Sequence, residues 1–484
     1  MKRNFHALLA CITALSMCLA ICLAASHAWA TPAPAPDEKI LPIPSSRAQT
    51  LYSKAQDDLL QIRVLLKNGR TQSSVGSGFL VGSTNLVVTN YHVVSQFALE
   101  PETYFGEYVD THGQRGSVKL LAVDALHDLA VVQVGRQGKG YFNISDALPT
   151  LTQGQYLYSL GNPLDLGFAI SEGSYNGVIG RGFYDQLMFT GPINAGMSGG
   201  PNVTEDGRVA GVNVSKRLDG ELVSFLVPVQ YVRDLLKKVS ADASLVGIPG
   251  TPVNAKKPPE DFRKIITQQL LAHQNVMIDQ ILATPLSLKS LGPYQVPVRE
   301  SDQMRCWGRS NTRQENPFVL NNIDCTMESA VYISDQLQIG HVAIRHEFTR
   351  STDLDAIRFS ALMSASFKNE SFGSYKDINL TGPICNERFV SNQGLPLRAV
   401  LSVRAYRKFE GLYDFALLTS TTDESLVNLQ SRIDAKGVSF ENGQRITRTF
   451  IEAIQRKPAM LKPAIAAPAA PSAAKTVPAT GGKP

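Results

Sequence analysis

Three residues of this 484-residue chain have the types and the order of a nucleophilic catalytic site. His92 follows the strand-forming run in VVTNYHVVS, Asp128 precedes the apolar run in LHDLAVVQV, and Ser198 lies in the glycine-framed stretch NAGMSGGP. A serine attacks an acyl group when a histidine takes its proton, an aspartate orients that histidine and N–H groups face the developing oxyanion. Each residue alone has a structural explanation, as a histidine at a strand end, an aspartate cap and a serine in a turn. Together, in the order His, Asp, Ser, they predict acyl transfer to water on paired antiparallel barrels.

The elements that would position these residues lie between residues 51 and 240. Short apolar runs such as GFLVGSTNLVVTN, QYLYSLG and GRVAGVNVS are separated by Gly, Asn and Asp at turn positions, which predicts many short strands in a closed architecture. The last part of this segment predicts a helix, because four apolar residues recur there at helical spacing: Val232, Leu235, Leu236 and Val239.

A linker over residues 241–258, rich in Pro and Gly, precedes a second region, residues 259–457, which the patterns predict as a separate α+β domain. A helix is expected over 259–284, with a buried stripe of Phe262, Ile266, Leu270, Met277 and Ile281. His273 lies on this stripe and is interpreted as a core histidine.

Four further elements are predicted in the second region. Alternation in HVAIRHEF predicts a strand, and the same pattern in AIRFSALMSAS predicts another, joined to it as a hairpin through STDLD. Strands are also expected at RAVLSVRAYR and YDFALLTS, with a helix around GQRITRTFIEAIQRK.

The ends of the chain have the composition of targeting and linking segments. Residues 1–30 begin with Lys2 and Arg3, continue through an apolar stretch and end at Ala28-Trp29-Ala30, which predicts a cleavable signal peptide rather than a membrane anchor. The Pro- and Ala-rich residues 31–50 are expected to form a linker, and 458–484 a disordered tail. The protein is therefore expected to be exported, to a periplasm or to the exterior, with no membrane span after cleavage.

Charge and cysteine content limit the remaining classes of function. The chain carries 47 basic and 42 acidic residues, a net charge of +5 that falls to +3 without Lys2 and Arg3, so nothing indicates a nucleic-acid partner. Cys306, Cys325 and Cys385 remain after signal cleavage, and a disulfide between the first two is favoured because they are closest in sequence. Their spacing does not fit a zinc site, and no metal or cofactor is expected.

The segment from about Gly76 to Val239 resembles the trypsin-like domain of the bacterial HtrA/Deg serine protease family. The blocks that carry the resemblance are, in order, GSGFLV, TNYHVV, DLAVV, LGNPLDLG with GVIGR, GMSGGP, VAGVNV and SFLVPV. The resemblance implies an all-β, chymotrypsin/trypsin-like double β-barrel, with protein or peptide substrates. It leaves open whether the protein forms the homo-oligomer common in that family. The region after it has no recognised family.

The resemblance also implies a role for individual residues. His92 would be the general base, Asp128 its orienting partner and Ser198 the nucleophile, with the N–H groups of Gly196 and Ser198 as the oxyanion hole. The specificity pocket would have Ile193 on its floor and Asn213, Val214 and Ser215 along its wall. Pro192 stands six residues before Ser198, where an aspartate would select Lys or Arg, so small or medium aliphatic residues are the expected preference.

One residue departs from the family pattern and bears on whether Ser198 is catalytically competent. Met197 precedes the serine, whereas HtrA-like proteins usually have asparagine there and trypsin has an aspartate that pairs with a new N-terminus. Activation by zymogen cleavage is therefore not expected, and Met197 would influence how readily the loop forms a productive turn. The leading hypothesis is a serine endopeptidase; the alternatives are a catalytically impaired binding or scaffold protein on the same fold and, more weakly, an esterase.

Overall fold

The computed structural model describes residues 45–180, 182–216, 222–241, 261–311, 316–327, 331–333, 337–368, 372 and 379–458. The predicted signal peptide, most of the two predicted linkers and all but the first residue of the predicted tail lie outside these ranges. A helix, α2 (Ser46–Ala55), begins inside the segment that the sequence assigned to the first linker.

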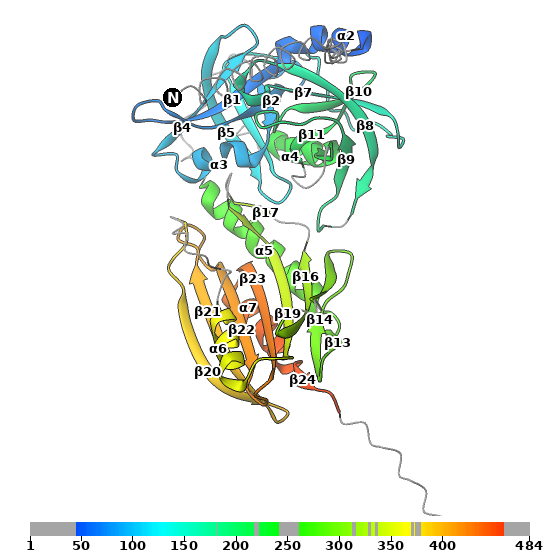
Figure 1. Ribbon diagram of the computed structural model, residues 1–484. Helices are drawn as coiled ribbons and strands as arrows, with labels where there is room; N and C mark the ends of the chain where they lie inside the picture. The colour runs from blue at the N-terminus through cyan, green and yellow to red at the C-terminus, as the bar shows by residue number, and fades with distance from the viewer. Residues whose placement is uncertain are drawn as a thin grey trace, which may run out of the picture. The chain divides into compact units, whose positions relative to one another are not determined.

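The first barrel is built from strands of which β1, β3 and β6 are mostly buried. Its six strands close in the order β1-β2-β3-β6-β5-β4, and four of them, β1, β2, β4 and β5, are labelled in Figure 1. Their bounds are β1 (Leu59–Leu66), β2 (Gln72–Leu80), β3 (Leu86–Thr89), β4 (Tyr104–Asp110), β5 (Arg115–Asp124) and β6 (Leu129–Val134). The helix α3 (Tyr91–Leu99) follows β3 directly, so the end of β3 fixes where this helix begins.

The second barrel closes in the order β10-β11-β12-β9-β8-β7. Its strands are β7 (Tyr156–Gly161), β8 (Ala169–Ile179), β9 (Gln186–Thr190), β10 (Pro201–Thr204), β11 (Val209–Lys216) and β12 (Ser224–Pro228). The predicted terminal helix is confirmed as α4 (Val229–Ala241), which buries Val232, Leu235 and Val239. Two closed six-stranded antiparallel barrels confirm the predicted chymotrypsin-like fold class.

The chain after the barrels contains a long antiparallel sheet with helices on both faces. The seven strands run in the order β15-β16-β19-β23-β22-β21-β20, and smaller sheets form from β13-β14-β24 and β17-β18. The strand bounds are β13 (Ser287–Leu291), β14 (Tyr294–Val298), β15 (Met304–Asn311), β16 (Phe318–Met327), β17 (Val331–Tyr332), β18 (Gln338–Ile339), β19 (His341–Ser351), β20 (Ile384–Asn392), β21 (Leu395–Ala405), β22 (Tyr413–Thr421), β23 (Val427–Val438) and β24 (Gln455–Arg456).

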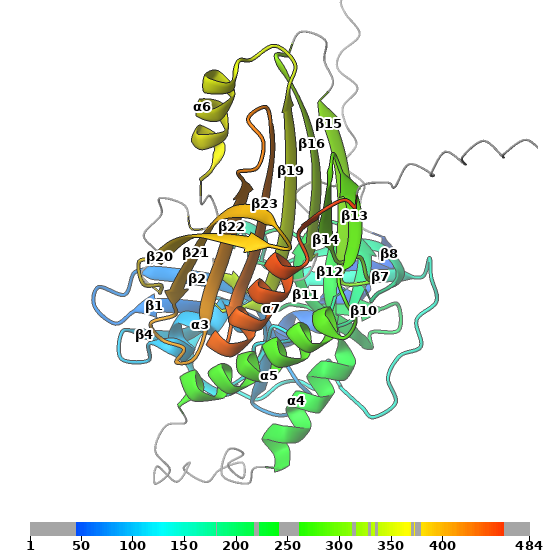
Figure 2. The ribbon, with the colours of Figure 1, turned by 90° about the horizontal axis from the view of Figure 1, so that it is seen from below.

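The helices of this region are α5 (Phe262–Leu282), α6 (Ala356–Ser366) and α7 (Phe440–Glu452). The helix α7 packs against β22 and β23 and contacts α5 (Figure 2). Leu429 and Ile433 of β23 face the core on that side, whereas Gln430 donates to the carbonyl oxygen of Met363 in α6. Since successive strand residues point to opposite faces, α6 covers the other face of the sheet.

Most elements predicted in this region are confirmed, but the strand predicted at AIRFSALMSAS is wrong, and so is the hairpin that was to join it to HVAIRHEF; β19 pairs with β16 and β23 instead. Residues 356–366, expected as a strand from their alternation, form the helix α6. Asp355 caps this helix by accepting hydrogen bonds from the N–H groups of Ile357 and Arg358, and its buried side chains, Phe359 and Met363, are four residues apart. A spacing of four residues places two side chains on one face of a strand as well as of a helix. The N-terminal cap formed by Asp355 favours the helix.

The disulfide favoured by the sequence is confirmed here. Cys306 and Cys325 are directly opposite each other on β15 and β16 and form a disulfide, while Cys385 is an exposed free cysteine. No helix among the described residues has both the length and the apolarity needed to cross a membrane. The described residues from Arg47 onward belong to one compact unit.

Candidate active site

His92 and Asp128 are joined by both oxygens of the carboxylate. Asp128 Oδ2 lies 2.7 Å from His92 Nδ1, and Asp128 Oδ1 accepts a hydrogen bond from the main-chain N–H of His92 at 2.9 Å. An ionised carboxylate can only accept, so Nδ1 of the neutral ring carries the proton and Nε2 carries the lone pair. This is the tautomer that a general base needs, since the lone pair on Nε2 can take a proton.

The main chain of Asp128 is held against the start of α3. Its carbonyl oxygen accepts from the N–H of Tyr91 at 3.1 Å and from the side-chain amide of Asn90 at 2.8 Å. Asp128 has a φ of 55°, a left-handed conformation that costs a non-glycine residue about 1–3 kcal/mol. The hydrogen bonds to Asn90, Tyr91 and His92 offset this strain, and they fix the carboxylate beneath the imidazole.

Ser198 lies in a tight turn between β9 and β10. Glycines with positive φ flank it, Gly196 at 90° and Gly199 at 86°. Within the turn, the N–H of Met197 donates to the carbonyl oxygen of Asn194, and the N–H of Gly200 donates to that of Met197, both at 3.0 Å. The hydroxyl of Ser198 donates to the carbonyl oxygen of Val214 at 2.9 Å. In this rotamer the proton of Ser198 points to the main chain of β11.

Ser77, a fully buried residue of the first barrel, clamps this turn. Its hydroxyl donates to the carbonyl oxygen of Gly196 at 2.7 Å, and its N–H donates to the carbonyl oxygen of Ser198 at 2.7 Å. The same hydroxyl accepts from the N–H of Asn162 at 2.9 Å. Ser77 therefore ties the Ser198 turn of one barrel to a strand of the other. The sequence analysis missed this role; its only signal was the serine inside the block GSGFLV.

The absence of a side chain at Gly199 permits the approach of the turn to the start of α3. A Cβ on this residue would lie 2.4 Å from Thr89 Oγ1 and 2.9 Å from the main-chain nitrogen of Asn90. Thr89 and Asn90 immediately precede Tyr91 and His92. The turn that carries Ser198 is thus packed onto the residues that immediately precede Tyr91 and His92.

Two main-chain donors of the turn have no acceptor. Among the described residues, neither the N–H of Gly196 nor that of Ser198 donates to a protein group. A Cβ at Gly196 would come within 2.4 Å of the carbonyl oxygen of Asn162, so this close packing and the positive φ both require glycine. An oxyanion hole needs main-chain N–H donors of this kind, and the assignment of these two groups to it stays a prediction.

Met197 is part of a hydrophobic core and does not disorder the turn. Its side chain is 2% exposed and belongs to the core cluster of the second barrel, with Leu157, Tyr175, Leu187, Phe189, Ile193, Ala210 and Leu226. The polar support of the turn comes from Asn213, whose side-chain amide donates to the carbonyl oxygens of Leu160 at 3.1 Å and Met197 at 3.3 Å. The turn is therefore built without a polar residue at position 197.

The residues expected to line the specificity pocket differ in their burial and in their contacts. Ile193 is 3% exposed and packs in the same cluster as Met197. Asn213 is fully buried, and its side-chain oxygen accepts from Ser159 at 2.8 Å. Val214 supplies the carbonyl oxygen that Ser198 contacts, and Ser215 lies in β11 opposite Phe225. Their role as a pocket stays a prediction.

A second histidine–aspartate pair lies beside the first in sequence. Asp124 Oδ2 is 2.8 Å from His127 Nδ1, and the His127 ring stacks on Tyr231 with ring centroids 3.8 Å apart. Burial opposes ionisation of Asp124, but the hydrogen bonds and the charge of His127 outweigh it and hold the pKa of Asp124 below its usual value. This pair packs against Tyr231 of α4, and it serves as an internal reference for the His92–Asp128 pair.

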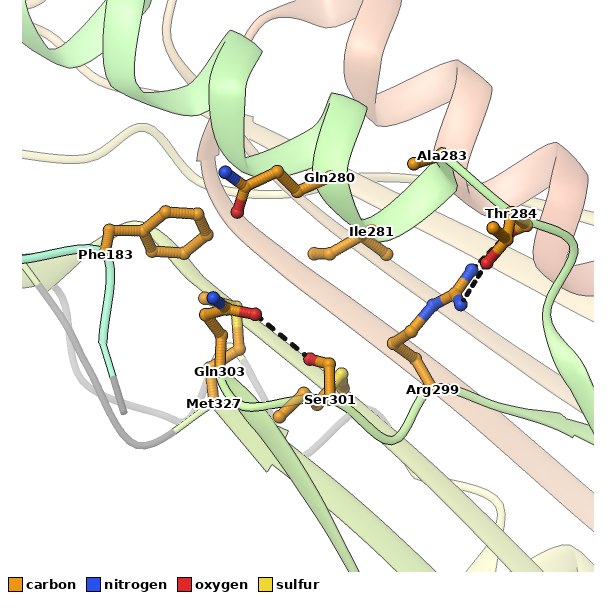
Figure 3. Close-up of a pocket in the computed structure, with 10 residues that line it drawn as sticks. Phe183, Gln280, Ile281, Ala283, Thr284, Arg299, Ser301, Gln303 and Met327 are labelled. Carbon is orange, nitrogen blue, oxygen red and sulfur yellow. Dashed lines mark hydrogen bonds between the residues drawn. The ribbon is translucent and has the colours of Figure 1, made fainter. Parts of the chain in front are cut away.

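A cavity of about 260 Å³ lies at the end of α5 (Figure 3). It is lined by Phe183, Gln280, Ile281, Ala283, Thr284, Arg299, Ser301, Gln303, Met304 and Met327. The guanidinium of Arg299 donates to Thr284 Oγ1 at 2.8 Å and to the carbonyl oxygen of Thr284, and burial lowers the pKa of Arg299. Arg299 thereby satisfies groups just beyond the C-terminal end of the helix, which is a structural role.

Comparisons with known proteins agree with this geometry. Residues 76–212, which contain His92, Asp128 and Ser198, match the family described as "Trypsin-like peptidase domain". A periplasmic serine endoprotease of the DegP-like type from Bartonella henselae is 31% identical over 190 residues, covering 37% of this chain and 36% of that protein. The mitochondrial serine protease HTRA2 of Drosophila virilis is 29% identical over 178 residues, covering 35% and 40%.

The match to solved structures is more distant. A serine endoprotease from Yersinia pestis is 22% identical, with a TM-score of 0.35, covering 41% of this chain and 68% of that chain. The chain spans well under half of the length of the curated relatives cited above. The resemblance found in the sequence is confirmed for the peptidase part of the chain.

Proposed function

We propose that the protein is a serine endopeptidase acting through His92, Asp128 and Ser198, because residues 76–212 match a trypsin-like peptidase domain and are similar to HtrA-type serine proteases. The observation that carries the proposal is the double contact of Asp128 with His92, made where the Ser198 turn packs against the start of α3. A histidine held in one tautomer beside a serine turn with two unused N–H donors is equipped for acyl transfer.

The proposed reaction begins with rotation of the Ser198 hydroxyl away from Val214. His92 Nε2 then takes the hydroxyl proton while Ser198 Oγ bonds to the peptide carbonyl carbon, and the negative charge moves to the carbonyl oxygen. The N–H groups of Gly196 and Ser198 stabilise this oxyanion; losing one such donor typically costs a factor of about 10² to 10³ in rate. Asp128 stays ionised and stabilises the imidazolium.

The second half of the reaction returns the enzyme to its starting state. His92 gives its proton to the leaving amine, the carbon–nitrogen bond breaks, and an acyl-enzyme on Ser198 remains. A water molecule then attacks the acyl carbon while His92 takes its proton, and the carboxylic acid leaves as Ser198 recovers its hydrogen. In the net reaction, one peptide bond and one water molecule are consumed, and one amine and one carboxylic acid are formed.

The proposal also covers the compartment of the protein and the class of its substrates. The signal-like residues 1–30, together with a relative named as periplasmic, support export, with the periplasm as the favoured compartment. The absence of an aspartate at position 192 argues against a preference for Lys or Arg, and small or medium aliphatic residues are proposed instead. Unfolded or extended protein segments are the proposed substrates.

One observation favours a second candidate. The Ser198 hydroxyl donates to Val214 rather than toward a base, which is a resting arrangement. A protein locked in that arrangement would be a binding or scaffold protein on a protease fold. Reaction of the full chain with a fluorophosphonate separates the two: labelling that disappears in Ser198→Ala supports the peptidase, and no labelling of the wild type at neutral pH supports the scaffold.

A further inference from the structure

We infer that Tyr332, contributed by the chain beyond the peptidase domain, is a specificity-determining residue of the proposed peptidase site. The inference rests on the proposed function. The Tyr332 ring lies beside the His92 imidazole, with ring centroids 5.4 Å apart and the planes inclined by 38°. The His92 side chain is 17% exposed, so a ring on one of its sides occupies much of the approach that a substrate side chain would use.

The neighbours of Tyr332 fix the direction in which its ring points. Val331 and Ile333 are 5% and 1% exposed and pack in the hydrophobic core that also contains Val93 and Val94 of α3. Tyr332 lies between them in a short extended segment, where successive side chains alternate in direction. Because its two neighbours enter the core, Tyr332 is turned the other way, toward His92.

Hydrogen bonds hold this segment in place. The hydroxyl of Tyr91, the residue before His92, donates to the carbonyl oxygen of Ile333 at 2.7 Å inside the core. The strand β17 pairs with β18, which places Tyr332 opposite Gln338. Burial, and then the charge of Asp128, raise the pKa of Tyr332, so its phenol stays neutral near the carboxylate.

The region that supplies Tyr332 is docked on the first barrel by a second set of contacts. Gln269 of α5 donates to the carbonyl oxygen of Val123 at 3.0 Å and accepts from the N–H of Ala125 at 2.9 Å, just before Asp128 in the chain. Lys408 forms an ion pair with Glu100, the residue that ends α3. Tyr332 is therefore mounted on a fixed support.

This position has a defined consequence for substrates. Any peptide whose carbonyl carbon reaches Ser198 must place one neighbouring side chain alongside the imidazole, and there it meets the Tyr332 ring. A small side chain such as Gly or Ala fits beside the ring, whereas Leu or Phe overlaps it. We therefore expect one substrate position at which the wild type selects small residues. Such steric discrimination is worth about 10- to 200-fold in kcat/KM.

The test is a positional-scanning peptide library hydrolysed by the full-length protein. Tyr332→Ala should raise kcat/KM for Leu or Phe relative to Ala at one position by at least about tenfold, and leave the other positions unchanged. Tyr332→Phe, which keeps the ring, should retain the wild-type profile. Tyr156→Ala, which removes a tyrosine that is 60% exposed on β7, is the control for a tyrosine lost elsewhere. Tyr332→Val serves as a second variant if the alanine protein unfolds.

The outcomes separate this inference from the proposed function. Identical profiles for wild type and Tyr332→Ala, with both hydrolysing peptides, would overturn the inference alone. An equal rise for all peptides, whatever their size, would also overturn it, because Tyr332 would then be a general obstruction. If the wild type neither hydrolyses peptides nor reacts with a fluorophosphonate, the proposed function fails and the inference fails with it.

Discussion

Asp128 contacts His92 with both carboxylate oxygens, one 2.7 Å from the ring nitrogen Nδ1 and the other 2.9 Å from the main-chain nitrogen. The second contact matters as much as the first, because it ties the carboxylate to the helix on which the ring is mounted. The imidazole therefore has a fixed tautomer and a fixed position before any substrate arrives.

Asp128→Asn should lower kcat by a factor of about 10⁴, since an amide at this position favours the wrong tautomer of the histidine, as in other serine proteases. Asp124→Asn is the matched control. It disrupts the neighbouring pair with His127, and it should change the rate by only a few-fold. Steady-state hydrolysis of one peptide by both variants makes the comparison, and equal losses in the two would refute the role of Asp128.

Met197→Asn, which installs the residue usual in HtrA-like proteins, should destabilise the fold without raising activity. The side chain at this position is 2% exposed among apolar residues, and burying an amide there costs about 1–3 kcal/mol. Met197→Leu preserves the volume and should cost less than about 1.5 kcal/mol. Denaturant unfolding and the rate of fluorophosphonate labelling test both. An asparagine variant that is equally stable and labels faster would contradict the core role of Met197.

Leu270→Ala in α5 should lower the free energy of unfolding by about 2–5 kcal/mol. Leu270 is fully buried in the core cluster that the first barrel shares with α5 and with the segment around Val331. Val276→Ala on the same helix is the control, because that side chain is 50% exposed and its loss should stay within about 0.5 kcal/mol. Equal effects in urea unfolding would argue against the shared core.

Stability should fall as the pH drops from about 6.5 to about 4. Burial lowers the pKa of His346 from 6.5 to about 4, while the carbonyl oxygen of Pro297 and the charge of Asp324 oppose the shift. Between these values the unfolded chain binds a proton that the folded chain does not, so folding is favoured above the range and weakened through it. The single histidine contributes about 3 kcal/mol by this linkage.

The variant His346→Gln removes this titration and should make the pH dependence of the unfolding free energy less steep over the same range. Part of the slope should remain, because burial also lowers the pKa of His273 and of His341 to about 4. His112→Gln removes a histidine whose side chain is 62% exposed, and it should leave the slope unchanged. Unfolding curves at several pH values measure both. The same slope in His346→Gln and in the wild type would contradict the assignment.

The residues of the candidate site that lie in short sequence motifs could be predicted from the sequence. His92, Asp128 and Ser198 each stand at the end of an apolar run or in a glycine turn, and such local patterns mark strand ends and turns. Ser77 and Tyr332 were not predicted, because they act across 119 to 121 and 240 residues of chain, respectively, through contacts that no local period encodes. The pairing of distant strands in the seven-stranded sheet was not predicted, for the same reason.

The incorrect prediction for residues 356–366 has a local cause. Phe359 and Met363 fit a strand face as well as a helix face, and over a short stretch the two periods cannot be separated by apolar residues alone. The deciding group was Asp355, whose side chain accepts from two N–H groups of the first turn. The segment STDLD therefore ends the strand β19 and, through Asp355, caps the helix α6.

The central claim is that Ser198 is a nucleophile activated by His92, and active-site labelling tests it most directly. Full-length protein is treated with a fluorescent fluorophosphonate at neutral pH, beside Ser198→Ala and Ser145→Ala. Ser145 is an exposed serine whose hydroxyl donates to the carbonyl oxygen of Ala147. We expect one label per chain in the wild type and in Ser145→Ala, and none in Ser198→Ala. An unlabelled wild type, or equal labelling of Ser198→Ala, would contradict the claim.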